Sequence, residues 1–225
     1  MRALALTLAI GVWTGAAAAE CRLALALALD TSSSVDAREH RLQREGLAAA
    51  LRHPDIRSAI LSGAPGHVAL AVYEWSGRYQ QALIQGWIPL DSDAAIDAAA
   101  ARLLGAPRSY SEFPTAIGYA LGYAAGLFEN GPDCARRVLD VSGDGIGNDG
   151  FGPRHAYRHF PFAGITVNGL AVGGHDPHVL DYYLDELRLG PEAFVEHAED
   201  YSDFQVTMTR KLLREIGTLA VGAAR

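Results

Sequence analysis

The chain has 225 residues, of which 49% are hydrophobic and 20% are charged. This composition excludes disorder of the whole chain, and two cysteines are too few for a disulfide-dense scaffold. The formal net charge is −7, and no run of basic residues is long enough to neutralise a phosphate backbone, so a nucleic-acid partner is not expected. The length suits a single domain.

The first 19 residues have the pattern of a secretory signal peptide. Arg2 precedes an apolar run, and small residues at 17–19 offer a cleavage site. The alternatives are an uncleaved anchor and a lipoprotein signal, although Glu20 stands where a lipoprotein signal has a small residue. We expect residues 1–19 to be removed and residues 20–225 to form one domain, periplasmic or secreted. No later apolar stretch is long enough for a membrane span.

Apolar runs alternate with helical patterns along the rest of the chain. A short apolar run between polar breaks is typical of a strand buried on both faces, and apolar residues spaced three and four apart indicate an amphipathic helix. The expected strands are residues 23–29, 68–75, 79–88, 137–142, 165–172 and 193–197. The expected helices are residues 35–51, 91–104, 115–128, 154–159, 177–189 and 203–219.

Strands that alternate with helices predict an α/β fold: a three-layer, doubly wound, mostly parallel six-stranded sheet. Residues 79–88 follow a short turn and are expected to form one antiparallel edge strand. In such sheets, ligands bind at the carboxyl ends of the strands, where the connections diverge to opposite faces. The polar breaks after Leu29 and Val141 fall at that edge, so a functional site is expected there.

The two cysteines, Cys21 and Cys134, each lie just before a predicted strand. If those strands are parallel neighbours, both thiols lie at the same end of the sheet, and an oxidising compartment would allow them to pair. Two separate buried thiols are the alternative.

The polar break after the first strand has the spacing D-x-S-x-S, with Asp30, Ser32 and Ser34 at the strand end and in the turn that follows. Asp144 ends another apolar strand in the same way. Two carboxylates and several hydroxyls around one point form an oxygen site of the kind that Mg²⁺, Mn²⁺ or Ca²⁺ prefers. Ordinary helix N-caps are the alternative explanation for these residue types.

The order of elements and the motif at residues 30–34 resemble the von Willebrand factor A domain with its metal-ion-dependent adhesion site. Residues 115–118 and 142–145 occupy the places of that family's threonine and second aspartate motifs, and residues 138–145 are also similar to a bacterial group of secreted A-domain-like proteins of unassigned function. The resemblance covers residues 22–219. It implies a metal site formed by Asp30, Ser32, Ser34, Thr115 and Asp144.

The same resemblance implies that Mg²⁺, or Mn²⁺ or Ca²⁺, leaves one coordination position open for an acidic group of a partner protein. The chain departs from the family pattern before Thr115, where Phe113 and Pro114 stand in place of the usual glycine. This departure makes a plain helix N-cap the alternative role for Thr115.

Two further polar residues lie near the predicted site. Asp140 is a charged residue inside a central strand, so we expect it to bond near the site or to pair with a basic side chain. Residues 144–150 are expected to form a tight turn in which Asn148 steadies Asp144, because the segment lacks the third and twelfth ligands of an EF-hand.

The function predicted from these residues is non-enzymatic: an exported module that binds a divalent cation and, through it, an acidic group of a protein. A metal-dependent hydrolase that uses the same cation to activate water is the alternative, and a structural domain without metal is the third. Ser142 lacks the flanking glycines of a nucleophile elbow. The pairs His155/His159 and His175/His178 hint at zinc but lack the glutamate of H-E-x-x-H. The oligomeric state is not predicted.

Overall fold

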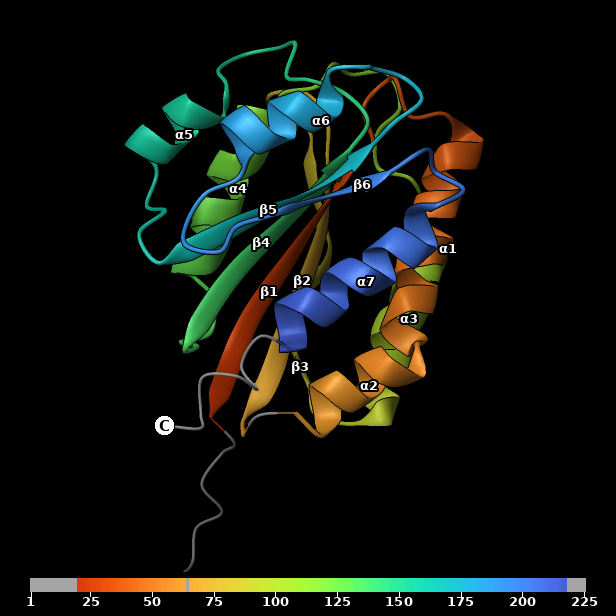
Figure 1. Ribbon diagram of the computed structural model, residues 1–225, viewed down its shortest axis with the longest axis vertical. Coiled ribbons are helices and arrows are strands. Elements are labelled where there is room, and N and C mark those ends of the chain that lie inside the picture. Colours follow the sequence, from red (N-terminus) through yellow and green to blue (C-terminus); the bar gives the residue numbers. More distant parts are fainter. Residues whose placement is uncertain (1–19, 64, 218–225) are drawn as a thin grey trace, which may run out of the picture.

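The computed structural model describes residues 20–63 and 65–217, and the predicted signal peptide lies outside them. The chain forms a sheet with helices on both faces (Figure 1). The strands are β1 (Cys21–Asp30), β2 (His67–Trp75), β3 (Gln81–Leu90), β4 (Arg136–Gly143), β5 (Ile165–Val172) and β6 (Val195–Ala198). The helices are α1 (Ala37–Arg52), α2 (Pro54–Leu61), α3 (Asp93–Gly105), α4 (Ile117–Glu129), α5 (Pro153–His159), α6 (Val179–Tyr182), a π-helical turn η1 (Tyr183–Leu187) and α7 (Phe204–Gly217).

The six strands lie in the order β3-β2-β1-β4-β5-β6. All neighbouring strands are parallel except β2 and β3, which are antiparallel. The predicted fold class, a mostly parallel six-stranded sheet with one antiparallel edge strand between two helical layers, is therefore confirmed. β1 and β4 lie at the centre of the sheet, so the two polar breaks identified in the sequence end neighbouring strands.

The two faces of the sheet are packed differently. The leucines of β1, at 23, 25, 27 and 29, belong to a core shared with α1, α2, α3 and α7. The alanines at 24, 26 and 28 belong to a second core with α4, α5, α6 and η1, where Tyr73 and Trp75 of β2 supply volume. Figure 1 shows the two helical layers on opposite sides of the sheet. The run LALALAL therefore combines a large-residue face with a small-residue face.

One helix was not expected from the sequence. The prediction ended the first helix near His53, whereas the chain starts a new helix, α2, at Pro54. Proline is well tolerated in the first turn of a helix because its missing N–H has no intrahelical partner there, and the His53 side chain accepts a hydrogen bond from Asp55 N. The break in α1 thus redirects the chain and does not end the helical layer.

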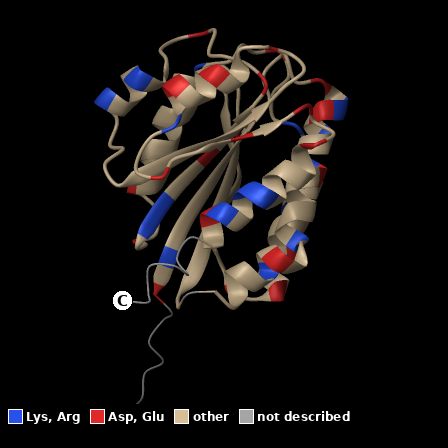
Figure 2. Cartoon of the chain, viewed as in Figure 1, with Lys and Arg blue, Asp and Glu red and all other residues tan. Residues whose placement is uncertain are grey.

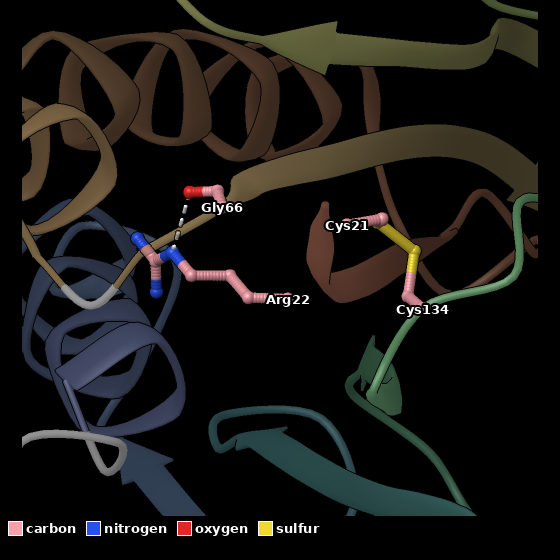
Figure 3. Close-up of a disulfide and its surroundings, with 4 residues drawn as sticks. All are labelled: Cys21, Arg22, Gly66 and Cys134. Atoms are coloured by element: carbon pink, nitrogen blue, oxygen red, sulfur yellow. Dashed lines mark hydrogen bonds between the residues drawn. A yellow bond between two sulfur atoms is a disulfide. The ribbon is translucent and has the colours of Figure 1, made fainter. Parts of the chain in front are cut away.

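A disulfide joins Cys21 and Cys134 (Figure 3), with their Cα atoms 4.6 Å apart. The pairing expected from two parallel neighbours is present, and the alternative of two free thiols is wrong. Next to it, Arg22 donates hydrogen bonds to the carbonyls of Gly66 and Ala59 at the same edge of the sheet. A closed loop with a sequence separation of 113 gives a stabilisation of roughly 4–5 kcal/mol in the chain-entropy account.

None of the helices in the described ranges is long and apolar enough to cross a bilayer.

Candidate metal site

The candidate site lies at the carboxyl edge of the sheet, where β1 ends at Asp30 and β4 ends at Gly143. The register pairs Leu29 with Ser142, so the two strand ends lie side by side. Parallel neighbours bring their last residues to the same edge, and this places Asp30 close to Asp144, which follows β4. The two carboxylates predicted from separate motifs are therefore neighbours.

A chain of hydrogen bonds links the predicted ligands. Asp30 Oδ1 accepts a bond from the Ser32 backbone N–H at 2.7 Å, which fixes the turn after β1. The hydroxyls of Ser32 and Ser34 are 3.1 Å apart. Ser34 Oγ donates to Asp144 Oδ1 at 2.7 Å. The D-x-S-x-S motif and the aspartate after β4 thus form one cluster of oxygens, as the sequence predicted.

The remaining carboxylate oxygens of this cluster are orphaned. Asp30 Oδ2 and Asp144 Oδ2 are both buried and have no hydrogen-bond partner within the described part of the chain. Burial raises the pKa of Asp30 to about 7, and the neighbouring charge of Asp144 adds to this shift. Burial also raises the pKa of Asp144. The charge of Arg108 opposes the shift of Asp30 but is the smallest of its causes, and neither acid forms an ion pair among the described residues. Buried ionised acids are costly, so the residues present fit a bound cation.

Space for this cluster depends on Gly143. The same position is close to Tyr183, a residue that the sequence analysis missed. A Cβ at Gly143 would lie 2.7 Å from Asp30 Oδ2 and 2.7 Å from the Tyr183 hydroxyl, so only glycine leaves room there. The Tyr183 hydroxyl is buried, and no hydrogen-bond partner for it exists among the described residues. Tyr183 comes from η1, and nothing in its local sequence distinguishes it from an ordinary core tyrosine.

Thr115 faces the same hollow as Ser34. The hollow has a volume of about 190 Å³ and is lined by Ser33, Ser34, Thr115, Gly145, Ile146, Asn148, His175 and Asp176. Helix α4 has its N-cap at Ala116, so Thr115 does not cap it, and the alternative role considered for Thr115 is wrong. Gly145, in the loop after β4, lies beside Thr115: a Cβ added there would be 3.9 Å from Thr115 Oγ1, an ordinary contact distance.

Asn148 has a different partner from the one expected. Its Oδ1 accepts a hydrogen bond from Thr115 N at 2.9 Å, and its own N–H donates to Thr115 O at 3.0 Å. Asn148 therefore holds the Thr115 backbone, and the expectation that it steadies Asp144 is replaced by this pair of bonds.

Asp140 lies outside the site. Its side chain is on the sheet face covered by α7, where Asp140 Oδ2 and Lys211 Nζ are 2.8 Å apart. Lys211 also pairs with Glu215 at 2.6 Å, so the buried aspartate belongs to an ion network in the core. Of the two expectations for Asp140, the one that paired it with a basic side chain is confirmed.

The sequence analysis missed two sets of contacts that hold the candidate site in position. Arg108 Nη2 donates to the backbone carbonyls of Val35, Thr31 and Ser32, so one guanidinium holds the turn that contains the D-x-S-x-S motif. Arg108 lies between α3 and α4, in the same connection that carries Thr115. A lone arginine in a loop gives no sequence signal for such a contact.

The second set of contacts is made by the buried carboxylate of Glu74, near the end of β2. It contacts His40 at 2.7 Å and Arg44 at 2.8 Å, and accepts a bond from Ser109 N at 2.8 Å. Burial alone would raise the pKa of Glu74, but hydrogen bonds from His40 and Ser109 lower it to about 2. This network ties α1 and β2 to the connection that holds Arg108. A glutamate inside an apolar strand indicates a buried side chain with a partner, and the sequence analysis did not use this feature of Glu74.

The donor set is one of hard oxygens. Within residues 20–63 and 65–217, no group of three or more His, Cys, Asp or Glu side chains could hold a metal, and neither histidine pair belongs to one. The candidate site instead combines two carboxylates with hydroxyls, a set suited to Mg²⁺ and similar cations.

Solved structures define the class of this fold. The chain is similar to a von Willebrand factor type A protein from Catenulispora acidiphila, with a TM-score of 0.62, 16% identity, and coverage of 88% of this chain and 43% of the other. It is also similar to the mussel byssus proximal thread matrix protein 1 with a zinc-occupied MIDAS motif (0.58, 16%, 90% and 49%). A third is the pilus adhesin SpaC from Lactobacillus rhamnosus GG (0.62, 12%, 88% and 31%). The fold is therefore that of a von Willebrand factor A domain.

The chain belongs to the family described as "Protein of unknown function (DUF1194)", whose family model matches residues 20–220. The chain spans less than half the length of each of the three solved chains. A comparison with curated proteins gave no match.

Proposed function

We propose that this protein is an exported, non-enzymatic binding module that holds a divalent cation, Mg²⁺ in the first place, and uses it to capture an acidic group of a partner protein. The residues that would hold the cation are Asp30, Ser32, Ser34, Thr115 and Asp144. The observation that carries the proposal is a pair of buried carboxylate oxygens, Asp30 Oδ2 and Asp144 Oδ2, that have no hydrogen-bond partner in the described part of the chain. The Oδ1 atoms of the same two aspartates are linked through Ser32 and Ser34.

The chemistry follows from the charges of the donor set. Two carboxylates balance a divalent cation, while neutral hydroxyls add oxygens without adding charge. A cation held in this way attracts a further anionic ligand, and the hollow beside Ser34 and Thr115 offers that ligand access. A carboxylate from a partner protein fits this role. The proposal is further supported by the structural likeness to a pilus adhesin and to a protein with a zinc-occupied MIDAS motif.

Export is the second part of the proposal. It is supported by the leader pattern of residues 1–19 and by the disulfide, since structural disulfides form and persist in oxidising compartments. Periplasmic and extracellular locations fit equally well. Fractionation of cells that express the native sequence, with a thiol count on the recovered protein, tests this part. Protein retained in the cytoplasm with two free thiols would refute it.

The metal site is tested by calorimetric titration of the purified chain with Mg²⁺, Mn²⁺ and Ca²⁺. We expect saturable binding to one site and its loss in Asp144→Asn, because that variant keeps the shape of the side chain and removes the charge. Asp133→Asn, on an exposed aspartate away from the site, is the matched control and should bind normally. No heat with any of the three cations would refute the proposal. Turnover of an ester, phosphoester or peptide substrate that depends on Asp144 would favour the hydrolase instead.

A further inference from the structure

A row of aromatic rings begins beside the candidate metal site and crosses to α5. Its first ring, Tyr79, is in the turn between β2 and β3. The successive centroid distances are 6.2 Å for Tyr79–Tyr119, 4.4 Å for Tyr119–Phe151, 4.9 Å for Phe151–His155 and 4.1 Å for His155–His159. We call these five residues the ring row. Phe160 flanks it, 6.1 Å from Phe151.

The ring row is continuous with the site. Asp149 N donates to Thr115 O at 3.3 Å, and the Asp149 side chain pairs with Arg78 at 2.7 Å. The turn that carries Tyr79 and the loop that carries Phe151 are therefore joined through Asp149, and the backbone N–H of Asp149 is bonded to Thr115, the residue proposed as a cation ligand. Tyr119 lies in the first turn of α4, one helical turn after Thr115 in the chain.

Much of this row is open to solvent. Tyr79 is 82% exposed, the largest exposed fraction among the large apolar side chains of the described residues. His155 and His159 are also exposed, while Tyr119 and Phe151 are half-buried. Exposed aromatic side chains that lie in contact with one another mark an interaction site more often than scattered ones do.

The ring angles decide which part of the rings a partner can meet. Tyr119 and Phe151 are stacked with 29° between their planes, and His155 and His159 with 18°. Tyr79 instead meets Tyr119 edge-on at 74°, and Phe151 and His155 are tilted by 41°. The stacked pairs turn their edges outward, whereas the exposed ring of Tyr79 keeps a face open to a partner. Aromatic side chains of a partner can pack on such a face, and ring edges, which carry the positive part of the quadrupole, suit carboxylates.

The far end of the row is basic. Helix α5 carries Arg154 and Arg158 beside its two histidines, and the basic character of this helix appears as blue segments in Figure 2. Arg154 pairs with Glu186 at 2.7 Å. Among the described residues, Arg158 donates a hydrogen bond to the Arg154 carbonyl and pairs with no carboxylate. In a chain with net charge −7, this end complements an acidic ligand.

We propose that the ring row and the basic face of α5 dock an extended segment of a partner protein that is both acidic and aromatic. One acidic side chain of this segment occupies the cation site, and further side chains on the same side of the segment lie against the rings. In an extended chain these side chains recur at about 7 Å, which is more than the 4.1–6.2 Å between neighbouring rings, so successive side chains of the segment need not contact successive rings. The cation end of this docking mode rests on the function proposed above.

Synthetic dodecapeptides test the inference by fluorescence anisotropy with saturating Mg²⁺ and again with EDTA. Two peptides carry one aspartate and two tryptophans at alternate positions, placed after it in one and before it in the other. A third has serine in place of both tryptophans. We expect one tryptophan peptide to bind about tenfold more tightly than the serine peptide, because each aromatic contact adds a modest free energy.

Variants of the protein test whether the ring row causes this preference for tryptophan. Tyr79→Ser should lower the tenfold preference to about threefold or less. Arg158→Glu should weaken the binding of all three peptides about threefold, because it places a negative charge where the ligand is acidic. Val206→Ser is the matched control, because Val206 is 68% exposed on α7, on the other face of the sheet, and this variant should bind as the wild type does. Equal losses in the control would overturn the assignment to the row.

The two proposals fail in different ways. Mg²⁺-dependent binding with no preference for tryptophan overturns the ring row and leaves the cation site standing. A preference for tryptophan that is the same in Mg²⁺ and EDTA supports the row and overturns the cation site as the anchor. No binding of either tryptophan peptide overturns the inference, and so does tighter binding of an oligogalacturonate that is lost in Tyr79→Ser.

Discussion

Replacing Asp144 by asparagine should change the stability of the protein in opposite directions with and without a cation. Without a cation, Asp144 and Asp30 are two buried acids on neighbouring strand ends, and each makes the ionised form of the other less stable. Asparagine keeps the oxygen that accepts the bond from Ser34 and removes the charge. The apo protein should therefore become more stable.

The magnitude follows from the pKa of Asp30. A folded-state pKa of about 7 against an ordinary value of 3.8 means that the contribution of Asp30 to stability is most favourable below pH 4 and becomes less favourable as the pH rises to 7. Roughly three pKa units correspond to a loss of about 4 kcal/mol above pH 7. Burial is the larger cause and Asp144 the second, so removing Asp144 should restore about 1–2 kcal/mol.

The assay is thermal and urea unfolding at pH 8 in EDTA and in Mg²⁺. In EDTA, Asp144→Asn should melt about 2–8 °C above the wild type. In Mg²⁺ at about 100 times its dissociation constant, the wild type should gain about 2.7 kcal/mol and the variant only a small part of this, so the order reverses. A variant that is less stable than the wild type in EDTA, yet responds normally to Mg²⁺, would refute the reasoning.

Three further predictions concern pH and the supporting contacts. Because a proton on Asp30 competes with the cation, Mg²⁺ affinity should fall about tenfold for each pH unit below 7, and calorimetry that gives a flat profile between pH 5.5 and 7 would contradict this. Glu74 has a pKa of about 2 against an ordinary 4.5, so it contributes roughly 3 kcal/mol that is fully present above pH 4.5 and is lost as the pH falls to 2. Urea unfolding between pH 2 and 4, where Asp30 stays protonated, should show this loss in the wild type and not in Glu74→Gln. Arg108→Lys should weaken Mg²⁺ binding about tenfold, since an ammonium cannot reproduce the planar fork that holds the three carbonyls of the motif turn. Unchanged affinity in this variant would show that the turn holds its shape without that fork.

Local pattern was enough to predict most of the fold. The apolar runs at residues 23–29 and 137–142 lie within β1 and β4, and their polar breaks end neighbouring strands as expected. The antiparallel edge strand followed from its short turn. Helix α2 was missed because proline was interpreted only as a helix stop, although it also fits a first turn.

The oxygen cluster was predictable in part. Asp30, Ser34 and Asp144 could be placed together because parallel neighbours share an edge, and the structure joins them by hydrogen bonds. Thr115 was expected only from the resemblance, because nothing local brings a loop between two helices to that edge. The contacts of Arg108 and Tyr183 depend on chain segments far apart in the sequence, and pattern analysis does not reach such pairs.

The small-residue face of β1 also determines how close the second helical layer can come. Ala24, Ala26 and Ala28 share a core with Ala120 and Ala124 of α4, so small side chains lie on both sides of this contact. The position of Thr115, in the loop just before α4, therefore depends on how α4 packs against the sheet. In a relative with valine or leucine at those β1 positions, the larger side chains would push α4 and the loop before it away from the sheet. Such a relative would keep every residue of the D-x-S-x-S motif but would lose the threonine hydroxyl from the site. Cation binding at the proposed site should therefore depend, among such relatives, on the alanines in the middle of β1 as well as on the motif itself.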